Sequence, residues 1–404
     1  MRQPRFALRI LVITCVAHCV THMVLLLFTA VKHEMSVDLG VGKEDIASVF
    51  ALTSVFFGLG AVPSGWLSDR LGERSLMVAF FFLCAVGTLL IGISHSAWVL
   101  VAGGIVLGLA TSIYHPVANA LISKGVEARG RAMGINGIAG SLGTALGPAF
   151  DGLIGADSWR TSFLVVTIPC VFLGLMLCFL DLGPASRPVD RQASDAARTE
   201  KGTSESRSLL VRLFGFLLTA MTLGGFFYYM FTTILPEYVS WTASDSAENS
   251  PIDARAGGLA AGLILVIGTV GQMVGGVLSD RYDGRVLYVC IYAILIPLVL
   301  PLAYLSGTTA LVLAAAASTV YFAVQPVENH LIAQYTPAAW KGRIFGLKFI
   351  LVFSIGGGLG TRIAVDLEQG PGVPLVFLVS AVALSVALAC TVVASRIKVA
   401  RADH

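Results

Sequence analysis

The sequence predicts an all-α membrane protein with twelve transmembrane helices, arranged as two pseudo-symmetric halves of six helices each. Composition is the first observation: the 404 residues are 56% hydrophobic and 13% charged, and the mean hydropathy is +0.83. Second, long apolar segments recur, each close to the roughly 20 residues that a helix needs to cross the hydrocarbon core. Third, a charged decapeptide occurs twice, as GWLSDRLGER at 65–74 and as GVLSDRYDGR at 276–285.

The apolar segments form two sets of six, separated by a polar segment. The first run exceeds the roughly 7–15 apolar residues of a cleavable signal sequence, so we expect it to remain as a helix. We expect an N-terminal half at 1–182, a flexible cytoplasmic linker rich in Ser, Ala, Arg and Asp at 183–207, and a C-terminal half at 208–404. The longest outside loop is expected at 236–255. The predicted spans are 8–31, 45–66, 75–93, 97–122, 132–155, 161–181, 208–233, 256–279, 286–306, 308–334, 343–366 and 373–395.

The placement of basic residues predicts the topology. Most of the 27 Lys and Arg residues lie in segments that a cytoplasmic N-terminus would put inside, as the positive-inside rule expects. We therefore expect a multi-pass protein of the bacterial inner membrane with both termini in the cytoplasm. The net charge of +3 then reflects topology, and no nucleic-acid partner is expected. The seven cysteines all lie in predicted spans without a CxxC pair, which indicates packing rather than disulfides.

The repeat extends beyond the decapeptide. YHPVANALIS at 114–123 aligns with VQPVENHLIA at 324–333, so that Asn119 corresponds to Asn329. Halves related in this way are typical of secondary transporters, whose substrate site lies between the repeats near the middle of the membrane. We therefore expect Asn119 and Asn329 to line the substrate cavity.

The charged turn can act as a cytoplasmic latch between the two halves. Gly65 permits close helix approach, and Asp69 at the membrane boundary can accept hydrogen bonds from a helix N-terminus or an arginine. The alternative is a charged loop that only fixes topology, and the second copy favours the latch. The predicted latch residues are Gly65, Asp69, Arg70, Arg74, Asp280, Arg281, Arg285, Arg131 and Arg343.

Gly65-x-x-x-Asp69-Arg70-x-Gly72-x-Arg74 resembles the signature between the second and third helices of the major facilitator superfamily. Glu73 departs from that pattern, because the family usually has a basic residue there. The resemblance covers the whole chain through the number of spans and the repeat. It implies the major facilitator fold and alternating access by rocking of the two halves.

Two further resemblances suggest export. Gly143-x-x-x-Gly147-Pro148 resembles the motif of drug/proton antiporters, although Asp151 stands where glycine is usual. Gly143 and Gly147 allow tight helix contact, and Pro148 favours a bend. TSIYHPVANALIS at 111–123, together with GRAMGINGIAG and QPVENHLIAQYTP, looks like the fosmidomycin-resistance branch of exporters. That resemblance implies proton-driven efflux of a small molecule.

Ionisable residues inside predicted spans are candidates for proton coupling, because a charge at mid-helix costs about 2.5–3.5 kcal/mol on insertion scales. Glu328 shares a helix face with Gln325, and Lys348 in the next span can pair with it. Glu328 is either a proton carrier or half of a static ion pair. His115 aligns with Gln325 and can titrate near neutral pH. Asp151 is a candidate for proton entry or gating.

The first span contains CVAHCVTH, which places Cys15, His18, Cys19 and His22 on one helix face. His at i and i+4 could hold a transition metal, which leaves a metal exporter as an alternative function. One helix face rarely completes the coordination, and no further Cys/His cluster is visible in the sequence. We therefore predict no bound metal and expect His18 and His22 to line the cavity or relay protons; plain packing is the alternative.

The sequence lacks the P-loop, GxSxG and HExxH patterns, so we do not expect an enzyme. The combined prediction is a secondary active transporter, a proton-coupled antiporter that exports a small drug or metabolite. The alternatives are a proton symporter for an organic acid, a metal exporter, and a receptor that transports nothing. We expect no cofactor besides the proton gradient, a small-molecule substrate and the lipid bilayer as partners, and a monomer.

Overall fold

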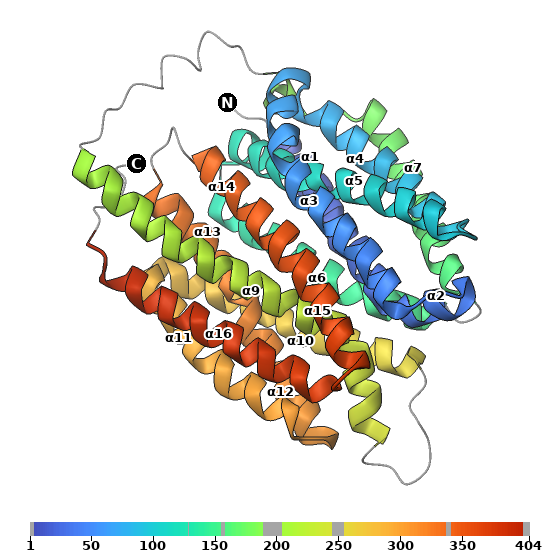
Figure 1. Ribbon diagram of the computed structural model, residues 1–404. Helices are drawn as coiled ribbons and strands as arrows, with labels where there is room; N and C mark the ends of the chain where they lie inside the picture. The colour runs from blue at the N-terminus through green and yellow to red at the C-terminus, as the bar shows by residue number, and fades with distance from the viewer. Residues whose placement is uncertain are drawn as a thin grey trace.

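The computed structural model describes residues 4–127, 129–154, 158–188, 204–244, 254–336 and 341–398, and these contain helices and no strands. The first half comprises α1 (Pro4–Ala30), α2 (Lys32–Leu39), α3 (Lys43–Leu71), α4 (Glu73–Gly92), α5 (Ala97–Gly125), α6 (Arg129–Ile154), α7 (Trp159–Phe179) and the short η1 (Pro184–Ser186). The second half comprises α9 (Ser204–Ser244), α10 (Ala254–Arg281), α11 (Gly284–Val299), η2 (Leu300–Ala303), α12 (Gly307–Phe322), α13 (Val324–Tyr335), α14 (Lys341–Phe349), the π-helical η4 (Ile350–Gly357), α15 (Gly358–Gln369) and α16 (Val373–Arg396). Figure 1 shows them as a bundle of long helices.

The twelve predicted spans all fall on helices. Eleven helical segments of the described chain are long and apolar enough to cross a membrane. α12 with α13 forms one of them, and α14 with η4 and α15 forms another. α6 is the twelfth helix, and it packs between α1 and α10. The expected fold class, an all-α membrane protein of twelve helices, is confirmed.

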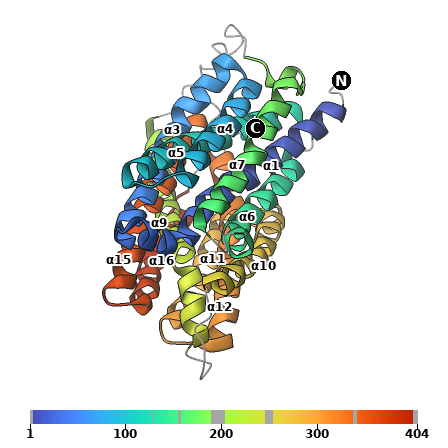
Figure 2. The same cartoon turned by 90° about the vertical axis from the view of Figure 1, so that its right-hand side faces the viewer.

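Each half of the chain has its own apolar core. One core is built mainly from buried residues between 10 and 182, and the other mainly from residues between 213 and 394. α6 packs on α10, and α3 packs on η4 and α15, so these contacts join the halves. The two termini lie at the same end of the bundle, and the view in Figure 2 shows the helices running along its length. The exact limits of the halves stay a prediction.

The tight contact predicted at Gly143 and Gly147 is confirmed. A Cβ at Gly143 would overlap the carbonyl oxygen of Cys19, and one at Gly147 would lie 2.8 Å from the Leu27 nitrogen. α6 therefore lies directly against the backbone of α1, and only glycine permits this distance. Pro148 lies inside α6, which continues through it.

Two predicted boundaries differ from the structure. The expected outside loop from 236 is wrong for its first part, because α9 continues to Ser244. The reason is packing: Tyr238 is buried and its hydroxyl donates to the carbonyl oxygen of Leu302 at 3.1 Å. α9 also begins at Ser204, inside the expected linker. Residues 189–203 and 245–253 of these two segments lie outside the described residues.

Candidate functional site

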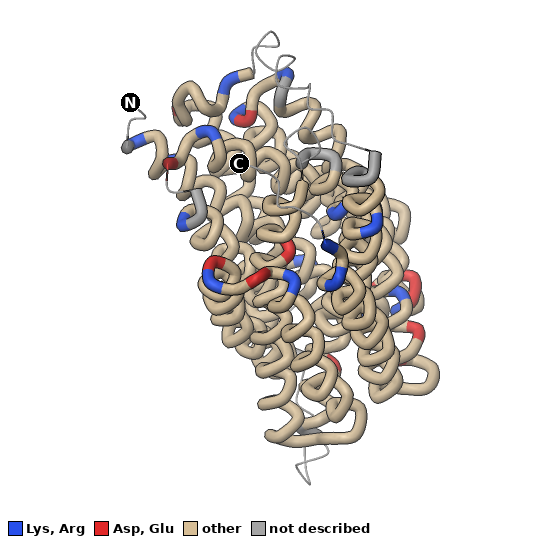
Figure 3. The backbone as a smooth tube through the Cα atoms, turned by 90° about the vertical axis from the view of Figure 1, so that its left-hand side faces the viewer, with Lys and Arg blue, Asp and Glu red and all other residues tan. Residues whose placement is uncertain are grey.

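The predicted pair of Glu328 and Lys348 is present. Glu328 on α13 and Lys348 on α14 place Oε2 and Nζ 2.9 Å apart, and their side chains are only 7% and 5% exposed. Lys348 Nζ also donates to Asn329 Oδ1 at 3.0 Å. Figure 3 shows that charged residues are sparse along the chain. A pair as deeply buried as Glu328 and Lys348 is costly to maintain unless each charge is compensated by a partner.

Two tyrosines that the sequence analysis missed complete the surroundings of Glu328. Tyr288 on α11 donates its hydroxyl to Glu328 Oε1 at 2.6 Å. The Tyr292 oxygen lies 3.2 Å from that of Tyr288, and Tyr292 donates to the carbonyl oxygen of Ala220 at 3.1 Å. Tyrosines in an apolar span read as core residues. Their i, i+4 spacing, which puts both hydroxyls on one face, was the available signal.

The remaining predicted cavity residues do not gather around Glu328. Gln325 Oε1 accepts from Gln272 Nε2 of α10 at 2.7 Å. Asn119 is half-buried on α5. Asp151 near the end of α6 accepts from the Ser162 hydroxyl at 2.8 Å. Gln325 thus helps to hold α13 against α10, and Asp151 connects α6 to α7.

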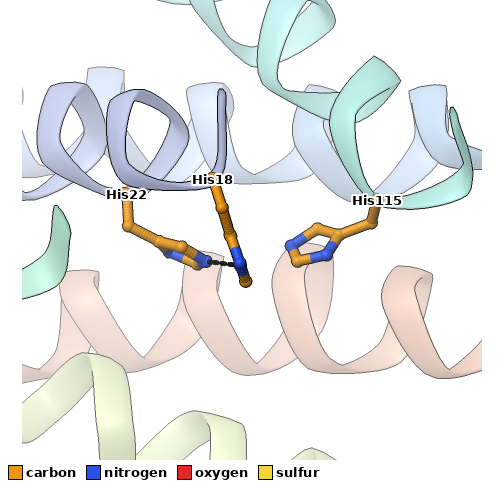
Figure 4. A group of neighbouring side chains, drawn as sticks. All are labelled: His18, His22 and His115. Atoms are coloured by element: carbon orange, nitrogen blue, oxygen red, sulfur yellow. Dashed lines mark hydrogen bonds between the residues drawn. The ribbon is translucent and has the colours of Figure 1, made fainter. Parts of the chain in front are cut away.

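A second polar group forms in the N-terminal half, where α5 brings His115 to the two histidines of α1. His18, His22 and His115 are all buried, and one ring nitrogen of each lies within 4.8 Å of the others. Figure 4 shows the three side chains converging, with a hydrogen bond of 3.2 Å between the Nε2 atoms of His18 and His22. His18 Nδ1 lies 2.7 Å from the carbonyl oxygen of Asn136. Neither Cys15 nor Cys19 belongs to this group.

His115 is also where the two halves touch through aromatic rings. Its ring stacks on Phe57 of α3 and on Phe349 of α14, with centroids 5.9 Å and 5.0 Å apart. Phe57 in turn stacks on Phe353 of η4 at 4.1 Å. Phe349 directly follows Lys348, so the helix that carries the lysine also packs against the histidines.

Two of the predicted latch residues, Arg74 and Arg285, contact the last helix of their own half in this state. Arg74 donates to the carbonyl oxygens of Leu177 and Cys178 at the end of α7. Arg285 donates to the carbonyl oxygen of Ile397 at the end of α16, 2.9 Å away. The two arginines hold equivalent places in the repeat, and each caps the last helix of its half.

No ion pair among the described side chains joins the halves near the remaining latch residues. Arg70 lies over the Trp66 ring, 3.6 Å from its centroid. Asp280, Arg281 and Arg131 are exposed, and Gly65 is partly exposed. The side chains of Asp69 and Arg343 lie outside the described part. Glu73, the departure from the family pattern, is buried and pairs with Lys124 of α5. The latch stays a prediction.

Ion pairs between the halves lie on the side opposite the termini. The Lys32 side chain on α2 is 3% exposed, and its Nζ lies 2.8 Å from Glu237 Oε1 of α9 and 3.9 Å from Glu368 Oε2 of α15. Lys43 of α3 also pairs with Glu368, at 3.3 Å. Arg362 of α15 donates to the carbonyl oxygen of Glu44 at 2.8 Å. These contacts hold the halves together on that side.

Comparisons with known proteins fit this arrangement. Residues 13–361 match the sequence profile of the Major Facilitator Superfamily. The chain is 27% identical over 255 residues to a protein of Cupriavidus necator named probable sulfoacetate transporter, covering 61% of this chain and 59% of that protein. It is 24% identical over 285 residues to a probable L-galactonate transporter of Escherichia coli K12, covering 64% and 61%. The matches thus span about three-fifths of the length of these two relatives.

A further relative matches over more of its length, and solved structures match throughout. The multidrug resistance protein MdtG of Enterobacter lignolyticus is 27% identical over 342 residues, which covers 82% of this chain and 78% of that protein. A bacterial homologue of the human lysosomal transporter Spinster, solved in an inward-facing and unoccupied conformation, superposes with a TM-score of 0.78 at 16% identity, covering 98% of both chains. A peptide transporter solved with sulfate gives a TM-score of 0.74 at 15% identity, covering 96% and 95%.

Proposed function

The chain belongs to the major facilitator superfamily, and from that premise we propose that it is a proton-coupled antiporter that exports a small organic compound by alternating access. That it is a membrane transporter of small solutes follows from the family and the fold. The antiport mode rests on one observation, the buried ion pair of Glu328 and Lys348 beside a pair of tyrosines.

Protonation of Glu328 changes all of its contacts. In the described state Tyr288 donates its hydroxyl to the Glu328 carboxylate. A protonated Glu328 no longer attracts Lys348, and its own hydroxyl can donate to the Tyr288 oxygen instead. Tyr288 can then turn its own proton toward Tyr292, 3.2 Å away. One proton therefore releases the lysine of α14 and reverses a hydrogen bond between α13 and α11, so that the packing of these helices responds to the proton.

Antiport requires the proton and the substrate to bind alternately. A substrate that donates hydrogen bonds to the Glu328 carboxylate meets this requirement, because protonation removes the charge that holds it. Export, rather than uptake, is supported by the Gly143–Pro148 segment that resembles the antiporter motif and by the similarity to a multidrug resistance protein. The proton gradient would be the energy source, without a further cofactor.

Symport of an organic anion is the second candidate, and Lys348 is the observation that favours it. Once Glu328 is neutral, the buried ammonium needs a new anionic partner, so the proton and an anion would bind together. Two relatives are named for anionic solutes, sulfoacetate and L-galactonate.

The membrane placement is part of the proposal. We propose the bacterial inner membrane, with both termini in the cytoplasm, for a monomer whose partners are the solute and the lipid bilayer. The contacts of Lys32 then lie on the periplasmic side, and the predicted latches, with Asp69 and Asp280 at their centres, would join the halves on the cytoplasmic side in the opposite state.

The direction of proton movement distinguishes the two candidates. In vesicles without a pH gradient, an added substrate of an antiporter carries protons out of the lumen, whereas a substrate of a symporter carries them in. A fluorescent pH probe inside the vesicles reports either change for a panel of phosphonates, organic acids and lipophilic cations. We expect lumenal alkalinisation by at least one compound.

The same assay tests Glu328 itself. Glu328→Gln should abolish the response while the protein remains folded. Glu73→Gln is the matched control, because Glu73 is equally buried and pairs with a lysine, but within the first half. Full proton-coupled export by Glu328→Gln would contradict the assignment, and lumenal acidification by an organic acid would replace antiport with symport.

A further inference from the structure

We propose that His18, His22 and His115 bind one divalent transition-metal ion, such as Zn²⁺ or Co²⁺, within the N-terminal half. This goes beyond the proposed transport cycle, which depends on the ion pair of the other half. The prediction of no metal rested on the two histidines of one helix face. The fold adds a third imidazole from α5, 93 residues further along the chain.

The contact of His18 prepares it as a ligand. A carbonyl oxygen can only accept, so His18 Nδ1 must carry the proton that bonds to Asn136. Its Nε2 then presents a lone pair toward the centre of the group. Metal-binding histidines are usually oriented in this way, by donating their second nitrogen to a backbone carbonyl.

His115 supplies an unused nitrogen. Its Nε2 is buried and has no hydrogen-bond partner among the described residues, and His115 as a whole is only 6% exposed. A buried polar atom without a partner is costly, and a metal ion would satisfy it. The stacked rings of Phe57 and Phe349 hold the imidazole in place without offering a polar contact.

The spacing is close to that of a metal site. Zn–N bonds of about 2.0–2.1 Å in a tetrahedron place two ligand nitrogens about 3.4 Å apart. The Nε2 atoms of His18 and His22 are already 3.2 Å apart. The widest spacing in the group, up to 4.8 Å, must shorten by about 1.4 Å when the ion binds. His22 must also carry its proton on Nδ1 instead of Nε2.

Imidazole nitrogens suit Zn²⁺, Co²⁺, Ni²⁺ and Cu²⁺, and a set without carboxylates does not suit Mg²⁺ or Ca²⁺. Three histidines leave one position of a tetrahedron for a ligand from solution, as in zinc sites that bind a small molecule. The group is thus a site with an open position rather than a closed structural site.

The test is binding of Zn²⁺ and Co²⁺ to the purified full chain in detergent, with any affinity tag removed. We expect one ion per chain by calorimetry, visible Co²⁺ absorption bands of four-coordinate geometry, and a higher melting temperature with Zn²⁺. His115→Ala should abolish all three. His95→Ala, at an exposed histidine, should change none of them.

A substitution that keeps every ligand provides an independent test. A Cβ at Gly140 of α6 would overlap the ring of His18, whereas one at Gly134 of the same helix has nothing within 4 Å. Gly140→Ala should weaken metal binding by about 10–100-fold, the usual effect of disturbing the surroundings of a ligand, and Gly134→Ala should not. Absence of stoichiometric binding in the folded wild type would overturn the proposal. So would binding that survives His115→Ala.

Discussion

Replacing Lys32 by methionine should open the side of the protein opposite the termini. Lys32 is the most buried cation there, and its Nζ contacts Glu237 and Glu368 and donates to the carbonyl oxygen of Thr233 at 2.5 Å. Methionine is unbranched and only one heavy atom shorter than lysine, and it removes the charge. Glu237 of the second half then loses its cation from the first half, whereas Glu368 keeps Lys43 as a partner.

The size of the effect follows from the burial of the pair. Removing one partner of a buried ion pair costs about 3–5 kcal/mol, and the lower end applies here because the Glu237 side chain is 22% exposed. A loss of about 3 kcal/mol changes an equilibrium by about a hundredfold. If the described state is favoured by about 100 to 1 over a state in which this side is open, the substitution makes the two states about equally populated.

Lys43→Met is the matched control. Lys43 belongs to the same network, but its side chain is 24% exposed, and its one ion pair among the described residues is with Glu368. More exposed pairs contribute about 0–1 kcal/mol, so this substitution should shift the equilibrium by about fivefold at most.

The assay is a distance distribution from double electron–electron resonance in lipid nanodiscs. Spin labels at positions 37 and 304 report the distance between the two halves, because Val37 lies near the end of α2 in the first half, Tyr304 follows η2 in the second, and both are exposed. The exposed Cys178 and Cys290 are first replaced by alanine. We expect a longer distance to appear in Lys32→Met and little change in Lys43→Met. An unchanged distribution in Lys32→Met would refute the reasoning that this contact holds the halves closed.

Three other predictions concern packing, pH and the latch. Gly143→Ala should lower the free energy of unfolding by about 1–3 kcal/mol or more through overpacking, whereas the methyl group of Gly134→Ala has open space. Thermal unfolding in detergent compares the two variants, and equal melting temperatures would contradict the packing argument. Asp38 accepts a hydrogen bond from Arg160 at 2.6 Å, and this bond lowers the pKa of Asp38. The contribution of the bond to the free energy of unfolding is therefore present above about pH 4, the pKa of an unperturbed aspartate, and is lost as the pH falls below it. The difference in melting temperature between wild type and Asp38→Asn should therefore vanish as the pH falls through this range, and a constant difference would count against the pair. Asp69→Asn should slow the exchange between states in single-molecule measurements, and an unchanged rate would argue against the latch.

Much of the fold was predictable because membrane spans are long and apolar. Each of the twelve spans is a predominantly apolar segment, and helix is the only open-chain structure that satisfies its backbone in lipid. The same reasoning found Glu328 and Lys348, since charges inside spans stand out and must be compensated. The spacing of His18 and His22 also predicted a shared face, and their hydrogen bond agrees with it.

Contacts between distant helices were not predictable from one sequence. Nothing in the sequence shows that α5 lies against α1, so the sequence alone does not group His115 with His18 and His22. Lys32 falls between the first two predicted spans, and its partner Glu237 falls in the expected outside loop, because the helical continuation of α9 past Pro236 has no clear signal in the sequence. The capping role of Arg74 and Arg285 required the position of the last helix in each half.

The two polar groups lie in different halves, yet one helix contacts both. Lys348 pairs with Glu328, and the next residue, Phe349, stacks on His115. The backbone that follows is the π-helical η4, a rare geometry that occurs frequently at functional sites. A movement of α14 on release of Lys348 would carry Phe349 with it, because the two residues are neighbours on one backbone. Such a movement would shift the ring that covers His115, so that occupancy of the histidine site and protonation of Glu328 would each change the equilibrium of the other.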